Sequence, residues 1–351
     1  MKTLFSLFCL VTYLTCALSA NGWPISIDMA CNKALSAVAC SFEFTNNANE
    51  DLYLLKRNTP LEGLDSEFVS VSLDGRPLDY EGFYMYHLPP AKDEFVLLKA
   101  GESISATVQI TDVFSIDTDG LYTVQYSRPL QYLSVNEMSA MSIDDLKELA
   151  VRESIHIHLE NTHLLLKPKK EEIKPDYTVH LQDCGTVSFA NGDRKNSETL
   201  EAHKRLCPRF DKLLKRNNLN SDFQKWFGAI SCSRAGIVQD TYKSIRSGLS
   251  KYSLTYFNRE WCKSYVVAFT VLSYSYSTVY LCEPFFNLEL YCVSTTGISK
   301  EDVLVHEWSH ALGRRRDRVY GRKNCEALAK SNPDKAVENA DTYAYYYCDT
   351  K

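Results

Sequence analysis

The stretch that decides the fold runs from Ser299 to Tyr320 and reads SKEDVLVHEWSHALGRRRDRVY. Residues 306–310 within it, HEWSH, form an H-E-x-x-H pattern. On a helix, the first and fifth positions of this pattern lie on one face, about one turn apart. Two imidazoles placed there can bind a single zinc ion, and the glutamate beside the first can act as a base.

The ends and the apolar side of this stretch favour a helix. Ser299 followed three residues later by Asp302 is typical of a capping box, and Gly313 is a stop signal. The apolar side consists of Val303, Leu304, Trp308, Ala311 and Leu312. A histidine pair on a buried helix can also merely satisfy hydrogen bonds, so the motif alone does not distinguish a metal site from a structural pair.

A catalytic zinc ion needs a third protein ligand, and three positions compete for that role. Glu326 on a following helix would give a thermolysin-like site. Gly313 stands where the metzincin pattern has its glycine, but that pattern puts the third ligand at Arg316, which does not bind zinc. The remaining candidate is Asp317, which opens the sequence DRVYG at residues 317–321.

The D-x-x-Y-G sequence at 317–321, shortly after H-E-x-x-H, resembles the aspzincin metallopeptidases, which comprise the deuterolysins and the peptidyl-Lys metalloendopeptidases. Residues 226–228, 278–286 and 331–343 resemble further segments of that family, in the same order. Together these segments cover most of residues 180–351. The resemblance implies a zinc metalloendopeptidase with an α+β, zincin-type catalytic domain and one zinc ion per chain.

The resemblance also implies roles for individual residues. His306, His310 and Asp317 would bind the zinc ion. Glu307 would be the general base, and Tyr320 would stabilise the oxyanion of the reaction. The spacer before Asp317 is shorter than in the family and reads RRR, which we expect to be a solvated loop.

Asp341 has two roles open to it. In lysine-specific relatives an aspartate and a glutamate of the last helix bind the substrate lysine; Asp341 matches the first, but Ala344 stands at the second. Asp341 would therefore either orient a ligand histidine or attract a basic side chain just after the cleaved bond. Strict lysine specificity is not implied.

Residues 1–20 are typical of a secretory signal peptide, with Lys2, an apolar run over 4–14 and small residues at 17–20. That run is too short to span a membrane, and no later stretch is long and apolar enough. We therefore expect a secreted, extracellular protein without a transmembrane segment.

The cysteines support an oxidising compartment. Of the 12 cysteines, Cys9 and Cys16 fall in the signal segment, which leaves ten, an even number. Cys31 and Cys40 are the only two before the catalytic region, so they pair with each other unless the two regions are cross-linked. The family resemblance implies two further disulfides, Cys262 with Cys282 and Cys292 with Cys348.

Residues 21–166 are β-rich, and their short alternating segments predict an antiparallel sandwich of the immunoglobulin type. Some aspzincins resemble this arrangement, with such a region before the protease. The alternating segments are Phe68–Leu73, Ser103–Ile110, Leu121–Tyr126 and Ile155–Leu159, with a capped helix expected at Ser142–Leu146.

Residues 167–178 are expected to be a linker, and residues 179–351 the metalloprotease domain. The linker is charged and contains two prolines as well as the dibasic pair Lys169-Lys170. It is either a solvated tether or a processing site, so residues 21–166 are either a permanent domain or a removable propeptide. In the protease domain we expect helices at Ser197–Lys215, 222–228, 234–249 and from Asn332 onward, and strands at Tyr252–Phe257, Tyr265–Leu272 and Thr278–Leu281.

The function expected from the sequence is hydrolysis of peptide bonds in proteins or peptides, with a bias toward a basic residue after the cleaved bond. The net charge of −5 gives no reason to expect a nucleic-acid partner, and a monomer is the expected state. One alternative is a catalytically silent secreted binding or toxin-like protein that retains the zinc site, although such a protein has no need of Glu307 and Tyr320. Another is a structural zinc site, which would normally be closed by four protein ligands.

Overall fold

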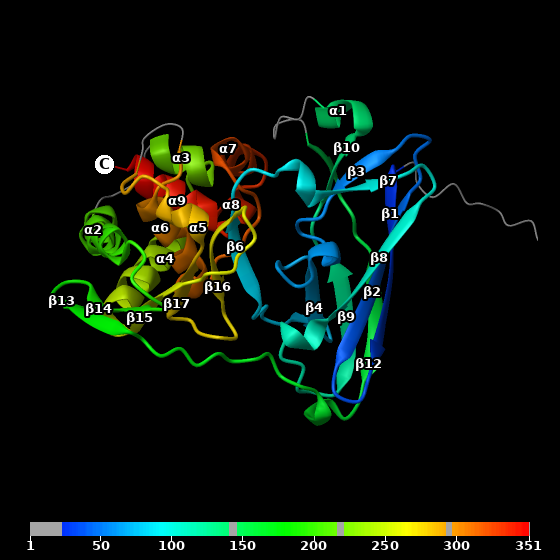
Figure 1. Cartoon of the computed structure of the whole chain (residues 1–351), viewed down its shortest axis with the longest axis horizontal. Coiled ribbons are helices and arrows are strands. Elements are labelled where there is room, and N and C mark those ends of the chain that lie inside the picture. The colour runs from blue at the N-terminus through cyan, green and yellow to red at the C-terminus, as the bar shows by residue number, and fades with distance from the viewer. Residues whose placement is uncertain (1–22, 140–145, 216–220, 293–296, 351) are drawn as a thin grey trace, which may run out of the picture.

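The computed structural model describes residues 23–139, 146–215, 221–292 and 297–350 of the chain (Figure 1). The expected signal segment and residues 142–145 of the helix expected at Ser142–Leu146 lie outside the described residues. Figure 1 shows two parts, a helical part with its own sheet and a β-rich part, which a long extended segment connects. No helix in the described part is long and apolar enough to cross a membrane.

The β-rich part contains three antiparallel sheets, and its buried apolar residues form one large cluster and one smaller cluster. The first has the order β1-β2-β8, the second β11-β10-β3-β7 and the third β12-β9-β4-β5. The bounds are β1 Ile25–Lys33, β2 Val38–Asn46, β3 Leu52–Leu55, β4 Val69–Leu73, β5 Arg76–Pro77, β7 Phe95–Leu98, β8 Ser103–Gln109, β9 Gly120–Tyr126, β10 Leu130–Ser134, β11 Lys147–Leu149 and β12 Ser154–Leu159, with helix α1 at Val135–Ser139.

The alternation in the sequence explains these strands. Along β9, for example, Tyr122, Val124 and Tyr126 are buried, while the residues between them are more exposed. The turn between β4 and β5 uses Asp74 and Gly75, both with positive φ, as a tight two-residue hairpin requires. The four alternating segments are therefore confirmed as strands, whereas the immunoglobulin type of the region stays a prediction.

The helical part is built on a six-stranded mixed sheet with the order β13-β14-β15-β17-β16-β6. Strands β14, β15 and β17 run parallel, and β16 is antiparallel to β17. The bounds are β13 Tyr177–Leu181, β14 Gly185–Ala190, β15 Ser253–Asn258, β16 Val266–Val271, β17 Thr278–Leu281, α2 Asn196–Lys215, α3 Ser221–Phe227, α4 Cys232–Lys251, α5 Glu283–Phe286, α6 Lys300–Ala311, α7 Arg322–Ser331, α8 Pro333–Ala336 and α9 Ala340–Asp349. An α+β arrangement is thus confirmed.

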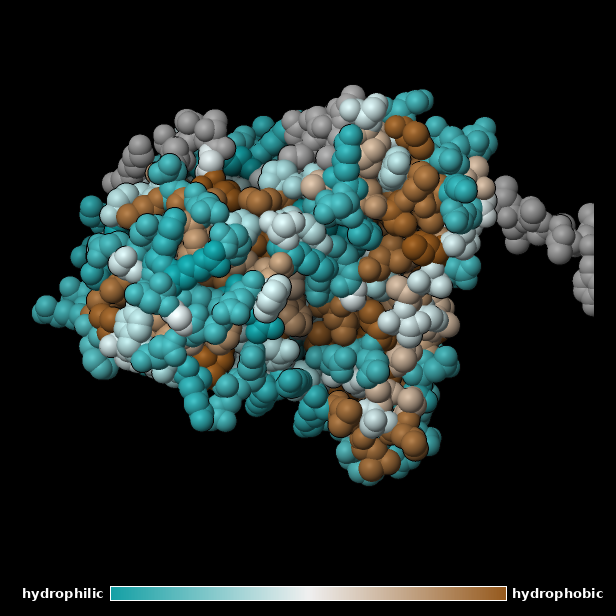
Figure 2. Space-filling model, viewed as in Figure 1, coloured by the Kyte–Doolittle hydropathy of each residue, from teal (hydrophilic) through white to brown (hydrophobic). Residues whose placement is uncertain are grey.

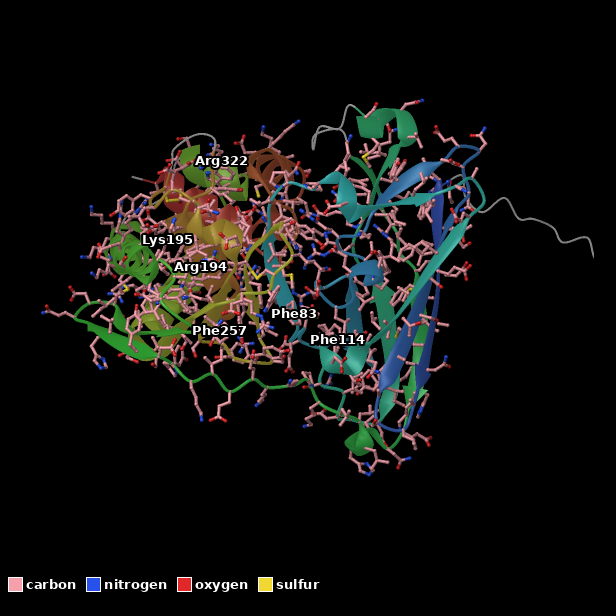
Figure 3. The ribbon with its side chains drawn as sticks, viewed as in Figure 1. Phe83, Phe114, Arg194, Lys195, Phe257 and Arg322 are labelled. Atoms are coloured by element: carbon pink, nitrogen blue, oxygen red, sulfur yellow. A yellow bond between two sulfur atoms is a disulfide. The ribbon has the colours of Figure 1, made fainter. Side chains whose placement is uncertain are left out.

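The last strand of this sheet comes from the N-terminal region. Strand β6 (Phe83–His87) pairs antiparallel with β16, from Phe83 opposite Val271 to His87 opposite Val266. Figure 1 shows β6 at the junction of the two parts, and Figure 3 labels Phe83 there. At the other edge, β13 begins at Tyr177, inside the segment expected to be the linker. The sheet therefore draws on sequence from both sides of that segment.

The expected final helix is wrong as a single element, because two helices replace it. Asn332 caps α8 as expected, since its side chain accepts a hydrogen bond from the amide of Lys335. The chain then leaves the helix at Val337–Asn339 and re-enters one at Ala340. The Asn339 side chain accepts from the amides of Arg318 and Val319 at 2.8 and 3.1 Å, so the break anchors the loop that carries Asp317.

Four disulfides join cysteines in the described part of the chain. They link Cys31 to Cys40, Cys184 to Cys207, Cys262 to Cys282 and Cys292 to Cys348. Cys232 and Cys325 are free thiols, the first exposed and the second buried. The even cysteine count thus corresponds to four bridges and two thiols.

Candidate metal centre

Helix α6 carries the H-E-x-x-H residues through the middle of the helical part. The Ser299 side chain accepts a hydrogen bond from the amide of Asp302 at 3.1 Å and so caps the helix. Trp308 donates to the Tyr256 hydroxyl of β15 at 3.0 Å, which fixes the helix on the sheet. After the helix, a Cβ at Gly313 would lie 2.7 Å from the Ser309 carbonyl oxygen, so only glycine fits this close turn.

Three ligand atoms converge at one point beside this helix. The Nε2 atoms of His306 and His310 lie 3.0 Å apart, and Asp317 Oδ1 lies 3.4 and 3.2 Å from them. All three side chains are buried, and Asp317 Oδ1 has no hydrogen-bond partner within the described residues. Among those residues, this is the group of histidine, cysteine and acidic side chains that could hold a metal ion.

The outer nitrogens of the two histidines fix which way their lone pairs point. His306 Nδ1 lies 2.7 Å from Asp341 Oδ1, and His310 Nδ1 lies 2.8 Å from the Arg315 carbonyl oxygen. Because both partners are acceptors, each Nδ1 carries the hydrogen and each Nε2 presents its lone pair to the centre. Two such nitrogens and an anionic oxygen so close together form a site that suits a cation.

The electrostatics of the centre favour a positive charge. Burial lowers the pKa of His306, but the charges of Asp317 and Asp341 outweigh it and raise that pKa to about 9. Burial raises the pKa of Asp317, but the two histidines outweigh it and hold that pKa below its ordinary value. Two imidazoles and one carboxylate match the protein ligand set of a catalytic zinc site.

Glu307 and Tyr320 face the same centre. Both oxygens of the Glu307 carboxylate are buried and lack a hydrogen-bond partner in the described part of the chain, and burial raises the pKa of this group well above its ordinary value. The Tyr320 hydroxyl donates to the carbonyl oxygen of Met85 at 3.0 Å, and its ring lies 6.3 Å from the His306 ring.

Asp341 uses both of its carboxylate oxygens within the protein. Oδ1 accepts from His306, and Oδ2 accepts from the backbone amide of Gly321 at 2.8 Å. The second of these bonds fixes the segment just after Tyr320. Of the two roles open from the sequence, this geometry suits the orientation of a ligand histidine rather than contact with a substrate.

The other competing residues lie elsewhere. Glu326, on α7, lies 3.5 Å from Lys225 and is partly exposed. The expectation of a solvated arginine loop at 314–316 is wrong for two of its residues. Arg316 pairs with Glu67 of the N-terminal region at 3.0 Å, and Arg315 donates to the carbonyl oxygen of Val337 at 3.1 Å. Both guanidiniums satisfy groups that no local sequence pattern brings together.

Strand β6 lies directly over the two histidines of this candidate centre. The Tyr84 ring stacks on the His310 ring at 4.4 Å between centroids. The Tyr86 ring meets the His306 ring edge-on at 4.5 Å. Both contacts are buried, so the N-terminal region covers the centre in this structure.

Sequence reasoning did not recognise Asp302 as a functional candidate. It is 3% exposed, and its Oδ1 has no hydrogen-bond partner among the described residues. Burial, followed by the charge of Asp341, raises the pKa of Asp302 to about 7. The available signal was its position four residues before His306, which puts it on the metal-binding face of the helix.

The family follows from comparison with known proteins. The family model for aspzincins, described as lysine-specific metallo-endopeptidase, matches residues 212–348. The peptidyl-Lys metalloendopeptidase of Pleurotus ostreatus is 32% identical over 126 residues, which are 35% of this chain and 71% of that protein. The chain belongs to the aspzincin family. This aspzincin is thus a metalloendopeptidase, as the sequence predicted.

Relatives also extend over the N-terminal region. An extracellular protease of Aeromonas hydrophila is 25% identical to this aspzincin over 317 residues, which are 88% of this chain and 87% of that protein. Among solved structures, a zinc peptidase from Grifola frondosa matches with a TM-score of 0.39 and 25% identity, over 45% of this chain and 96% of the other.

Proposed function

We propose that this aspzincin is a secreted, zinc-dependent endopeptidase that hydrolyses proteins or peptides at the centre of His306, His310 and Asp317. The observation that carries the proposal is the convergence of two Nε2 lone pairs and one carboxylate oxygen within 3.4 Å, with both Nδ1 atoms hydrogen-bonded to acceptors. Secretion is supported by the leader at residues 1–20 and by the extracellular protease of Aeromonas hydrophila.

Each side chain of the proposed site has its own role in catalysis or in positioning. Zinc, when bound, supplies a Lewis acid that activates water and polarises the scissile carbonyl. Glu307 takes a proton from the attacking water and passes it to the leaving amine, a role that suits a carboxyl group with a raised pKa. Tyr320 donates to the oxyanion from the position where it now donates to Met85. Asp341 and the Arg315 carbonyl hold the two imidazoles in place.

We propose in addition that residues 21–166 are a propeptide that blocks the catalytic domain of residues 179–351. An extended substrate would bind by adding a strand to the edge of the sheet, and β6 now occupies that edge along β16. Lys169 and Lys170 are exposed in the segment that connects the two parts, so a protease can reach them. The immunoglobulin type of the propeptide remains part of this proposal.

The test measures zinc content by elemental analysis and casein hydrolysis, before and after cleavage in the linker, with and without a chelator. About one zinc ion per chain, and hydrolysis that appears on cleavage and disappears with chelator, are expected. Hydrolysis that survives complete removal of metal would refute the proposal, as would a zinc-loaded, cleaved protein that hydrolyses no protein substrate.

A further inference from the structure

The register of β6 defines where a substrate would be cut. The Met85 carbonyl oxygen accepts from Tyr320, the proposed oxyanion donor, so this carbonyl stands in for the scissile one. Residue 86 then stands in for the substrate residue directly after the cleaved bond. Its side chain points to the ligand histidines, whereas Met85, the residue before it, packs in a cluster with Val266 and Phe269 of β16.

The buried Tyr86 side chain marks the pocket for that substrate residue. Its ring lies against His306 of α6, and it shares a buried apolar cluster with Tyr345 of α9. Burial raises the pKa of Tyr86 well above its ordinary value, and the charges of Tyr345, Asp341 and Asp302 raise it further. Asp302 lies one helical turn before His306 on α6, and Asp341 accepts from His306, so the Tyr86 ring packs beside the histidine that both carboxylates flank.

The two carboxylates differ in whether both of their oxygens are hydrogen-bonded. Asp341 is committed through both oxygens, to His306 and to Gly321. Asp302 Oδ1 is buried without a partner in the described part of the chain. A buried oxygen in this condition costs free energy unless a donor arrives.

The charge of Arg322 lowers the pKa of Asp302, but no ion pair joins these two side chains among the described residues. Arg322, labelled in Figure 3, makes two contacts with Asp349, at 2.9 and 3.1 Å. It also stacks on the Tyr345 ring, with 4.8 Å between the guanidinium carbon and the ring centroid. The structure thus leaves Asp302 without an ion-pair partner among the described residues.

We infer that Asp302 is the specificity residue of this aspzincin and binds the ammonium or guanidinium of a substrate lysine or arginine directly after the cleaved bond. This inference rests on the proposed function. It places the second carboxylate of the pocket on the metal-binding helix α6, although the last helix has only Ala344 where lysine-specific relatives carry a glutamate. A lysine side chain is about as long as that of Tyr86, so its ammonium would reach the same end of the pocket.

The first test needs no catalysis and uses the whole chain, in which residue 86 fills the pocket. Tyr86→Lys is compared with Tyr86→Met, a neutral side chain of similar length, with Asp302 intact and with Asp302→Asn. Thermal unfolding at pH 8 should give the lysine variant a Tm equal to or above that of the methionine variant when Asp302 is present. With Asp302→Asn, the lysine variant should melt several degrees below the methionine variant, because its buried ammonium then lacks a partner. An equal lysine–methionine difference in both backgrounds would overturn the inference.

The second test measures specificity in the zinc-loaded protein after linker cleavage. Two fluorogenic peptides differ only in lysine or norleucine after the cleaved bond. Asp302→Asn should lower kcat/KM for the lysine peptide by about tenfold to a hundredfold and leave that for norleucine nearly unchanged. An unchanged ratio would overturn the specificity role even if the first test succeeds. If the wild type cleaves neither peptide while the Tm of Tyr86→Lys still depends on Asp302, the proposed function fails and the pocket assignment stands.

Discussion

At the scale of single residues, Glu307 combines burial with the absence of a partner. Glu307→Ala should keep about one zinc ion, because the residue contributes no ligand atom to the centre. It should lose peptide hydrolysis by a factor of at least about 10² to 10⁴, the usual contribution of a general base. Zinc analysis and kcat/KM for a fluorogenic peptide check this after linker cleavage. Appreciable hydrolysis by a folded, zinc-loaded variant would contradict the role given to Glu307.

Asp317 and Glu326 competed in the sequence for the role of third zinc ligand. A substitution at each of them tests which one binds the metal. Asp317→Ala should lose zinc, because its buried Oδ1 lies within 3.4 Å of both ligand nitrogens. Glu326→Ala should retain zinc, because Glu326 lies beside Lys225 at the surface. Equilibrium dialysis against a zinc buffer compares the two affinities. The reverse pattern of loss would restore the thermolysin-like assignment.

At the scale of elements, β6 is the part of the N-terminal region that covers the centre. Tyr84→Ala should weaken the packing of β6 on the catalytic part, because the ring stacked on His310 is lost. A buried aromatic side chain contributes about 3 to 5 kcal/mol to the stability of such packing. Hydrolysis of a small fluorogenic peptide by the uncleaved chain should then rise about tenfold or more. Tyr53→Ala, in β3 of the β-rich part, is the matched control and should leave this rate unchanged. Equal rates for both variants would argue against inhibition by β6.

Local patterns predicted the elements that local forces determine. The strand at Thr278–Leu281 has the expected bounds, and α2 and α4 begin and end within two residues of theirs, because apolar spacing and caps act over a few residues. The same reasoning identified the pattern at 306–310, whose two histidines the helix brings together by itself. Local patterns also explain the four strands confirmed in the N-terminal region.

Contacts between segments that are far apart in the sequence could not be predicted from local patterns. Phe83–His87 alternates poorly, and only its pairing with β16 makes it a strand of the catalytic sheet. Asp302 looked like a helix-capping residue, since the packing of α9 and β6 around it cannot be read from its neighbours in sequence. The arginines at 315 and 316 looked solvated because their partners, Val337 and Glu67, lie far away along the chain.

At the scale of the whole molecule, polar and charged contacts join the two parts beside the covered centre. Lys263 of the catalytic region contacts Asp65 at 2.7 Å, and Arg128 donates to the carbonyl oxygen of Arg318 at 3.3 Å. Figure 2 shows apolar surface on the β-rich part as well, near its junction with the helical part. Removal of the N-terminal region would therefore break these contacts and uncover the centre.

A buried histidine makes the stability of the catalytic part depend on pH. His203 of α2 accepts from the Tyr256 hydroxyl at 2.7 Å, and Tyr256 in turn accepts from Trp308 on α6. Burial lowers the pKa of His203 from 6.5 to about 4. This chain of bonds needs neutral His203, because a protonated Nδ1 could no longer accept from Tyr256.

The sign of the effect follows from the direction of that shift. Because the pKa of His203 is lower in the folded chain than in the unfolded chain, the unfolded chain binds more protons between pH 6.5 and pH 4. The stabilisation is complete above pH 6.5 and is lost as the pH falls toward 4, by up to about 3 kcal/mol. Urea unfolding of the Glu307→Ala protein with chelator, which prevents self-digestion and effects of metal loss, measures this dependence. His203→Gln should reduce the slope within that window, to which buried His87 of β6, with a pKa lowered to about 3, also contributes, whereas the control His156→Gln, at an exposed position of β12, should not. If His203→Gln kept the full slope between pH 6.5 and pH 4, the acid sensitivity would have to come from other groups, and the bonds through Tyr256 would not couple α2 to the metal-binding helix.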